Sequence, residues 1–153
     1  MPAGSDPGAA PALPRTFRPL GVRMAIYVAG VLLLVITAVT WFSFPADIRA
    51  LFTIGQRATV IGLGMMFYAA GWALARSRVV ATTEGLTVVN GFRSRRLAWN
   101  QVLAVRLRPG APWAELDLSD GTSVSAMGVQ GSDGDRARKQ VREIRALVER
   151  FTA

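Results

Sequence analysis

Arginines crowd one short stretch of this 153-residue chain, NGFRSRR, which covers residues 90–96. Arg93, Arg95 and Arg96 stand there beside an aromatic residue, Phe92. Guanidinium groups at this density could bind a phosphate, an anionic lipid headgroup or a nucleic acid. They could equally be solvated side chains at the tip of a hairpin. The choice depends on where the rest of the chain places this stretch.

Carboxylates are the other side chains that could carry chemistry, and three of them lie close in sequence at Glu115, Asp117 and Asp120. The first two share one face of a predicted strand, where Arg106 neutralises part of their charge. The chain has no histidine and no cysteine, so disulfides, the usual zinc ligands and histidine-based catalysis are excluded. We therefore expect no enzyme activity, no metal site and no cofactor.

Two apolar runs without a charged residue occupy the first half of the chain, at 24–44 and 58–75. As helices they would be about 31 and 27 Å long, against a hydrocarbon core of about 30 Å. The first run ends in TWFSFPAD rather than in the small-residue cleavage site of a signal peptide. The second lacks the polar positions of a soluble helix. Together they predict a transmembrane hairpin over residues 21–76.

Basic residues gather at the open end of this predicted hairpin, where the chain enters the first span and leaves the second. They precede the first span and follow the second: Arg15, Arg18, Arg23, Arg76 and Arg78. The loop between the spans holds only Arg49 and Arg57, with one acid. By the positive-inside rule both termini are cytoplasmic, in a multi-pass protein of the cell membrane. The net charge of +8 then reflects topology, and we expect no nucleic-acid partner.

The remaining residues divide into a tail and one domain. Residues 1–20 hold five prolines and little that could form a core, which predicts a disordered cytoplasmic tail. Residues 77–153 predict an antiparallel β-meander followed by one amphipathic helix with Ser132 as its N-cap. The predicted strands cover residues 79–83, 86–90, 95–99, 103–108, 113–118 and 123–127. The apolar stripe of the helix consists of Ala137, Val141, Ile144, Val148 and Phe151.

Alternation of apolar and polar residues sets the pairing inside the meander. The loop at 109–112 places Arg106 opposite Glu115, as an ion pair on the polar face. A three-residue loop at 120–122 would place Leu118 opposite Val124. We assign structural roles to a further set of residues, with Trp99 at the core edge and Trp113 stacked on Arg108: Trp99, Arg106, Trp113, Glu115, Asp120 and Gly121.

A curled antiparallel sheet closed by one C-terminal helix, behind two transmembrane helices, resembles a known bacterial family. The stretches that carry the resemblance are TTEGLTVVNGFRSRRLAWNQV (82–102), RPGAPWAELDLSDGTSVSAMGVQ (108–130) and the helix that begins SDGDRARKQVREIR. They are similar to the PH-like domain of the low molecular weight protein antigen 6 type. The resemblance implies an α+β fold, in which a two-helix transmembrane hairpin precedes a PH-like split barrel. It also implies a domain that holds ligands or partners at a membrane and has no catalytic residues.

Two functions follow from this arrangement. The first is a non-enzymatic, membrane-tethered module that presents a cytoplasmic domain to a protein partner. It predicts an exposed apolar patch or a free sheet edge away from the membrane. The second is contact with anionic lipid, because the second strand returns the arginine-rich turn to the membrane end of the domain. The residues of this lipid-contact hypothesis are Arg76, Arg78, Phe92, Arg93, Arg95 and Arg96.

Overall fold

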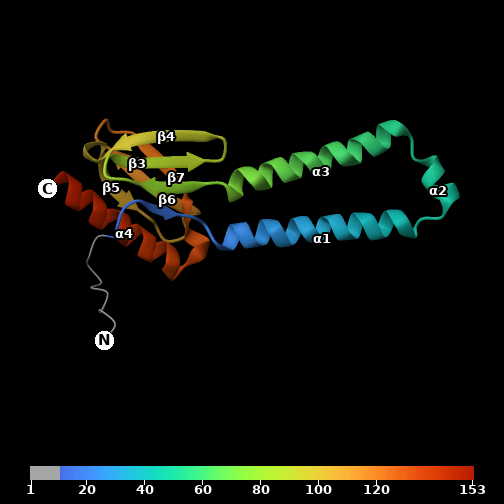
Figure 1. Ribbon diagram of the computed structural model, residues 1–153, viewed down its shortest axis with the longest axis horizontal. Coiled ribbons are helices and arrows are strands. Elements are labelled where there is room, and N and C mark those ends of the chain that lie inside the picture. Colours follow the sequence, from blue (N-terminus) through green and yellow to red (C-terminus); the bar gives the residue numbers. More distant parts are fainter. Residues whose placement is uncertain (1–10) are drawn as a thin grey trace.

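The computed structural model describes residues 11–153. A long helical hairpin extends from one end of a small β domain, which carries a C-terminal helix (Figure 1). The hairpin consists of α1 (Gly21–Ser43), the short helix α2 (Ala46–Leu51) and α3 (Ile54–Ala75). Both α1 and α3 are long and apolar enough to cross a membrane, as the sequence predicts. They begin at Gly21 and Ile54 rather than at residues 24 and 58.

The first sheet includes a strand from the N-terminal segment. Its order is β1-β2-β3-β4, with β1 (Arg15–Phe17), β2 (Arg78–Ala81), β3 (Gly85–Asn90) and β4 (Arg93–Ala98). All neighbours are antiparallel, and β1 pairs with β2 so that Phe17 lies opposite Val79.

The prediction of a disordered tail over residues 1–20 is therefore wrong for β1, whereas residues 1–10 lie outside the described residues. The physical reason is Phe17, whose side chain is 1% exposed and belongs to the hydrophobic core. Pro19 is also fully buried. One large apolar side chain is enough to stabilise a three-residue strand when the neighbouring strand already exists.

The second sheet contains β5 (Val102–Arg106), β6 (Trp113–Leu118) and β7 (Ser123–Gln130) in that order. The predicted pairing of Arg106 with Glu115 is present in the register of β5 and β6. The predicted pairing between β6 and β7 is wrong, because Leu116 and not Leu118 lies opposite Val124. Both registers point the same side chains inward, so the pattern of alternation could not distinguish them.

The C-terminal helix α4 (Asp135–Thr152) closes one end of the two sheets. Ser132 is not its N-cap, since Ser132 lies in the preceding 3-10 turn η2 (Gly131–Asp133) and the cap position is Gly134. At the distal end of the domain Trp99 stacks on Phe151, with ring centroids 5.0 Å apart. Its indole N–H donates a hydrogen bond to the Thr82 carbonyl (3.2 Å). Trp99 begins a second 3-10 turn, η1 (Trp99–Gln101), instead of ending a strand.

The two sheets meet where β7 crosses β2 and β3. Asn90 in β3 donates a side-chain hydrogen bond to the Ser125 carbonyl, and its amide oxygen accepts one from the Met127 N–H (3.0 Å). Gly128 lies so close to β2 that a Cβ there would be 2.5 Å from the Arg78 Cα. These contacts make the sheets a split barrel, with the core between them and α4 over the open end.

Candidate functional site

The turn between β3 and β4 lies against the C-terminal end of α3. The Gly91 N–H donates a hydrogen bond to the Ser77 hydroxyl (3.0 Å), and that hydroxyl donates one to the Ala73 carbonyl (3.1 Å). Gly91 adopts a φ of +60°, which favours glycine, and a Cβ there would be 3.4 Å from that of Ala73. The arginine-rich turn thus returns to the end of the hairpin, as the strand geometry predicts.

Four of the six residues in the lipid-contact hypothesis lie at this junction. The Arg76 guanidinium is 5.6 Å from the centre of the Phe92 ring, and Phe92 is 69% exposed. Arg93 lies directly after the turn, opposite Asn90, and Arg78 lies at the start of β2. We call Arg76, Arg78, Phe92 and Arg93 the base cluster.

The other two arginines are not part of this cluster. Arg95 and Arg96 lie farther along β4, opposite Val88 and Thr87. At about 3.3 Å per residue they are about 7 and 10 Å beyond Arg93. The Arg95 guanidinium is 4.0 Å from Asp120, on the second sheet. The turn is shorter than the sequence suggested, because β4 begins at Arg93 and not at Arg95.

A second junction joins the domain to the start of α1. The backbone N–H groups of Leu20 and Gly21 donate hydrogen bonds to the two carboxylate oxygens of Asp133, each at 2.9 Å. A carboxylate is favourable there, because the first N–H groups of a helix lack intrahelical partners and carry positive partial charge. With the predicted N-cap at Ser132, Asp133 would have been the first residue of α4. The turn η2 instead directs the side chain of Asp133 to α1.

Asp133→Ala is expected to loosen this junction, at a cost of about 1 kcal/mol. The predicted signature is faster hydrogen exchange at the amides of Leu20 and Gly21 in the full chain, with little change in β3. Asp135→Ala is the matched control, since Asp135 forms only an exposed pair with Arg138. Equal exchange in the two variants would contradict a capping role for Asp133.

The short connection from β1 to α1 is also fastened by α4. Arg15 forms an ion pair with Glu143 (3.1 Å), and the Gln140 side chain donates a hydrogen bond to the Arg18 carbonyl (3.4 Å). With the Asp133 contacts, these bonds hold the chain from β1 to the first turn of α1 against the domain. The β domain is therefore attached to both helices of the hairpin.

A third feature is a pair of hollows beside α4, the first against β5 and the second against η2 and the loop that follows β5. The first, of about 290 Å³, includes Leu103, Arg106, Arg145 and Glu149. The second, of about 460 Å³, includes Leu107, Arg108, the loop 109–112 and Arg138. Leu103 sits at a bulge in the register of β5 and is 67% exposed. β5 is the edge strand of its sheet, and the Arg145 side chain donates a hydrogen bond to its Val105 carbonyl (2.8 Å).

The carboxylates do not converge on a site. Arg106 lies opposite Glu115 in the register but forms its ion pair with the diagonal neighbour Asp117 (2.7 Å), so the predicted ion pair with Glu115 is wrong. Within residues 11–153, no group of three carboxylates is placed to hold a metal ion. The predicted stack of Trp113 on Arg108 is likewise absent from the cation–π contacts of this part of the chain.

Asp120 instead shapes the turn between β6 and β7. The Thr122 hydroxyl and N–H donate hydrogen bonds to one of its oxygens (2.7 and 2.9 Å), and Gly121 takes a φ of +80°. These bonds, the hydroxyl first, lower the pKa of Asp120 below its ordinary value of 3.8, and Arg95 adds to the effect.

Because the pKa of Asp120 is lowered in the folded state, its carboxylate stabilises the turn above the unfolded pKa. That contribution is lost as pH falls through the folded value. Titration of the Asp120 carboxyl carbon by NMR is expected to give a midpoint below the ordinary aspartate pKa of 3.8. Thr122→Val removes the hydroxyl donor and should raise the midpoint. An unchanged midpoint would assign the shift to other groups.

The fold and its junctions define a PH-like split barrel carried at the end of an apolar two-helix hairpin. Residues 76–147 match the family described as bacterial PH domain. The resemblance inferred from the sequence is confirmed. Domains of this family are generally non-enzymatic.

Curated relatives occur in mycobacteria. The chain is 30% identical over 100 residues to the uncharacterized protein Mb1452 of Mycobacterium bovis and to the uncharacterized protein Rv1417 of Mycobacterium tuberculosis. Each match covers 65% of this chain and 65% of the relative, slightly less than two thirds of the relative's length. No solved structure matches the chain significantly.

Proposed function

We propose that this chain is a non-enzymatic, membrane-anchored interaction module, whose cytoplasmic PH-like domain binds a protein partner. The observation that carries the proposal is the outer edge of β5, which pairs with no further strand among residues 11–153 and exposes Leu103, with Arg145 bound to its Val105 carbonyl. A partner-binding domain needs such an apolar, unpaired edge, whereas most exposed edges are protected by charges or cover.

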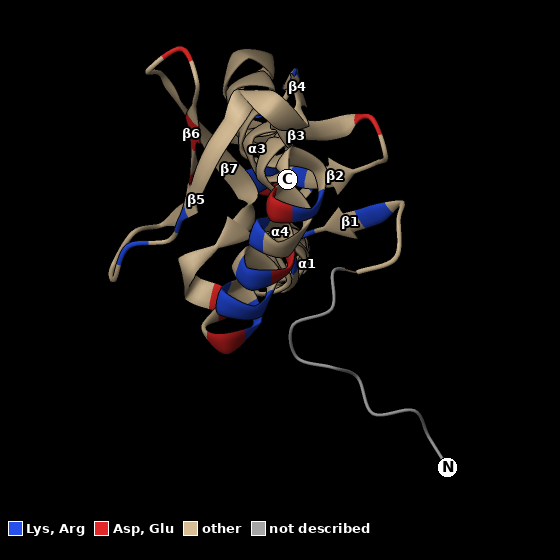
Figure 2. Cartoon of the chain, turned by 90° about the vertical axis from the view of Figure 1, so that its left-hand side faces the viewer, with Lys and Arg blue, Asp and Glu red and all other residues tan. Residues whose placement is uncertain are grey.

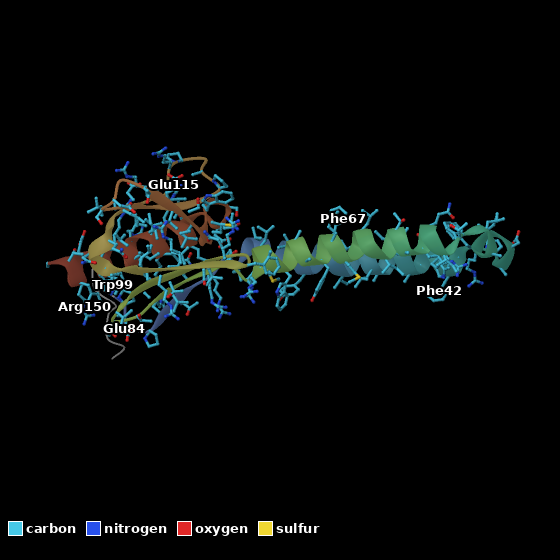
Figure 3. All side chains as sticks on the ribbon, turned by 90° about the horizontal axis from the view of Figure 1, so that it is seen from above. Phe42, Phe67, Glu84, Trp99, Glu115 and Arg150 are labelled. Atoms are coloured by element: carbon cyan, nitrogen blue, oxygen red, sulfur yellow. The ribbon has the colours of Figure 1, made fainter. Side chains whose placement is uncertain are left out.

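The position of this edge also favours a partner in the cytoplasm. Trp99, three residues before the start of β5, lies at the end of the molecule opposite the hairpin tip, which is marked by Phe42 (Figure 3). With α1 and α3 across a membrane, a ligand could reach this end of the domain without competition from lipid. The arginine bias around the hairpin supports a cytoplasmic domain.

Cysteine labelling tests the anchoring and the orientation, since the chain has no cysteine of its own. Asp47→Cys lies in α2, at the tip of the hairpin, and Ser119→Cys lies between β6 and β7. A membrane-impermeant maleimide should label Asp47→Cys in intact cells and Ser119→Cys only after permeabilisation. The reverse pattern would place the domain outside the cell. Recovery of the protein without membranes would contradict anchoring.

Partner binding is tested by a photo-crosslinking amino acid at Leu103 in cells that express the full chain. We expect one discrete protein adduct from Leu103 and none from Glu84, an exposed residue in the turn between β2 and β3. An adduct of the same size from both positions would contradict a specific edge on β5.

Contact with anionic lipid is a second candidate function, favoured by the base cluster. An exposed Phe92 under the Arg76 guanidinium, at the end of an apolar helix, has the chemistry of a headgroup contact. Each arginine near an anionic leaflet contributes about 1 kcal/mol. The effect would orient the domain on the membrane and leave the β5 edge free for a partner.

This second function is tested with the full chain in nanodiscs of neutral or anionic lipid. Amides of the turn at residues 91–94 should exchange more slowly in anionic discs, and Arg76→Gln with Arg93→Gln should abolish the difference. The double variant Arg95→Gln and Arg96→Gln is the matched control, because it removes the same charge outside the base cluster. Identical exchange in the two lipids would exclude headgroup contact by this turn.

A further inference from the structure

The two hollows are lined by consecutive residues of β5 and of the loop after it, and we treat them together as one groove beside α4. On one side the lining residues are continuous through β5 and its loop, from Leu103 to Pro112. On the other side lie Arg138, Arg145 and Glu149, which share one face of the helix. Apolar side chains contribute to the lining at Leu103, Leu107 and Val148. We call this surface the β5–α4 groove.

Charge gives the β5–α4 groove a preference for an acidic occupant. Its lining holds four arginines and one acid: Arg106, Arg108, Arg138, Arg145 and Glu149. Lysine and arginine positions recur along the ribbon of α4, with acidic positions between them (Figure 2). Guanidinium groups bind carboxylates in paired hydrogen bonds, so an acidic chain complements this surface and a basic chain is repelled.

The groove arginines are available for such a ligand. Arg138 is bound to Asp135 in an exposed pair, which is weak and can exchange. Arg106 is bound to Asp117 in a half-buried pair, but the Arg106 side chain itself is 55% exposed. Arg145 uses its Nε for the Val105 carbonyl and forms no ion pair among residues 11–153. Its two terminal nitrogens therefore remain as donors for a carboxylate.

The shape favours an extended occupant. The groove follows an edge strand, and edge strands bind extended peptides alongside them. The bulge at Leu103 exposes an apolar side chain, against which one apolar residue of a ligand could pack. Alternate residues of an extended peptide point to opposite sides, so acidic and apolar side chains can reach the arginines and Leu103 respectively.

We propose that the β5–α4 groove binds an extended acidic segment of a partner protein, with carboxylates on Arg145 and Arg106 and an apolar side chain on Leu103. The inference rests on the proposed function as a partner-binding module and specifies the chemistry of the partner. A second copy of this chain is the alternative occupant. The groove of one copy would then face the equally basic groove of the other, which disfavours that pairing.

The test uses the full chain in nanodiscs of neutral phosphatidylcholine, so that no anionic lipid competes. The probe is a fluorescent peptide of alternating glutamate and valine, with an alternating lysine and valine peptide for comparison. We expect the acidic peptide to bind and the basic one not to bind. Arg145→Glu and, independently, Leu103→Asp should each raise the Kd about tenfold, as expected for one lost charge-assisted or apolar contact.

Arg136→Glu is the matched control, because it makes the same charge change on α4 outside the groove and should change the Kd less than about twofold. Equal weakening by Arg136→Glu and Arg145→Glu would overturn the proposal in favour of unspecific attraction. The proposal would also be overturned if the acidic peptide did not bind at about 1 mM, or if the chain formed a dimer that Leu103→Asp dissociates. If the acidic peptide does not bind while crosslinking at Leu103 still gives one adduct, the proposed function as a partner-binding module is retained. Only the proposal that the partner segment is acidic is then wrong.

Discussion

Phe17→Ala should lower the free energy of unfolding of the β domain by about 3–5 kcal/mol, the usual cost of removing a buried phenylalanine. The side chain is 1% exposed and belongs to the same core as Leu86 and Ile144. It lies before the hairpin in sequence, within a segment whose composition suggests disorder. A large effect here would establish that this segment is part of the domain.

The measurement is urea unfolding of the full chain in nanodiscs, followed by hydrogen exchange of the β2 and β3 amides. Thr16→Ala is the control, since Thr16 occupies the same strand with an exposed side chain. We expect it to cost less than about 0.5 kcal/mol. Similar small losses in both variants would mean that β1 adds nothing to the core. For the same reason a fragment that starts at residue 76 should unfold more readily than the domain in the full chain.

Gly128→Ala should cost about 3 kcal/mol or more, at the upper end for an overpacked site. The added Cβ would lie 2.5 and 2.6 Å from the Cα and carbonyl carbon of Arg78, and 2.7 Å from the Val79 nitrogen. These are backbone atoms of β2, so no change of rotamer can relieve the clash. Either β2 or β7 must move, and the two sheets must separate locally.

The same unfolding experiment measures this loss, with Gly62→Ala as the control. No atom lies within 4 Å of the position of a Cβ at Gly62, so the same chemical change should not destabilise the chain. Hydrogen exchange should rise on both sides of the crossing, at Asn90 and Met127, whose hydrogen bond joins the sheets. Unaltered stability in Gly128→Ala would mean that β7 does not cross β2 at this point.

Much of the architecture could be predicted from the sequence because it has a local signal. The apolar runs predict α1 and α3, and the periodicities of two and 3.6 predict the meander and α4. β1 has no such signal, since Arg15–Phe17 is too short to show alternation and prolines flank it. Its pairing with β2 depends on residues far along the chain.

The candidate site was predictable in part. The return of the arginine-rich turn to α3 follows from the antiparallel order of β2 and β3. Lipid contact by Arg95 and Arg96 stays a prediction, although both lie in β4 and not in the turn. Contact of Asp133 with α1 could have been suspected from Leu20, because an apolar residue at the cap position leaves the helix N–H groups without a side-chain partner. The groove required the placement of α4 beside β5, which no local pattern specifies.

The pairing of β1 with β2 has a consequence for biosynthesis. The ribosome completes β1 before the hairpin and β2 after it, yet the two strands are neighbours in one sheet. In the membrane-anchored module that we propose, they can meet only when both helices have crossed and the flanking segments lie in the same compartment. If only one helix of the hairpin crossed the membrane, Phe17 and β2 would lie on opposite sides of it, and the core would be incomplete. Folding of the domain would thereby act as a checkpoint on insertion, because quality-control proteases recognise a chain whose core has not closed.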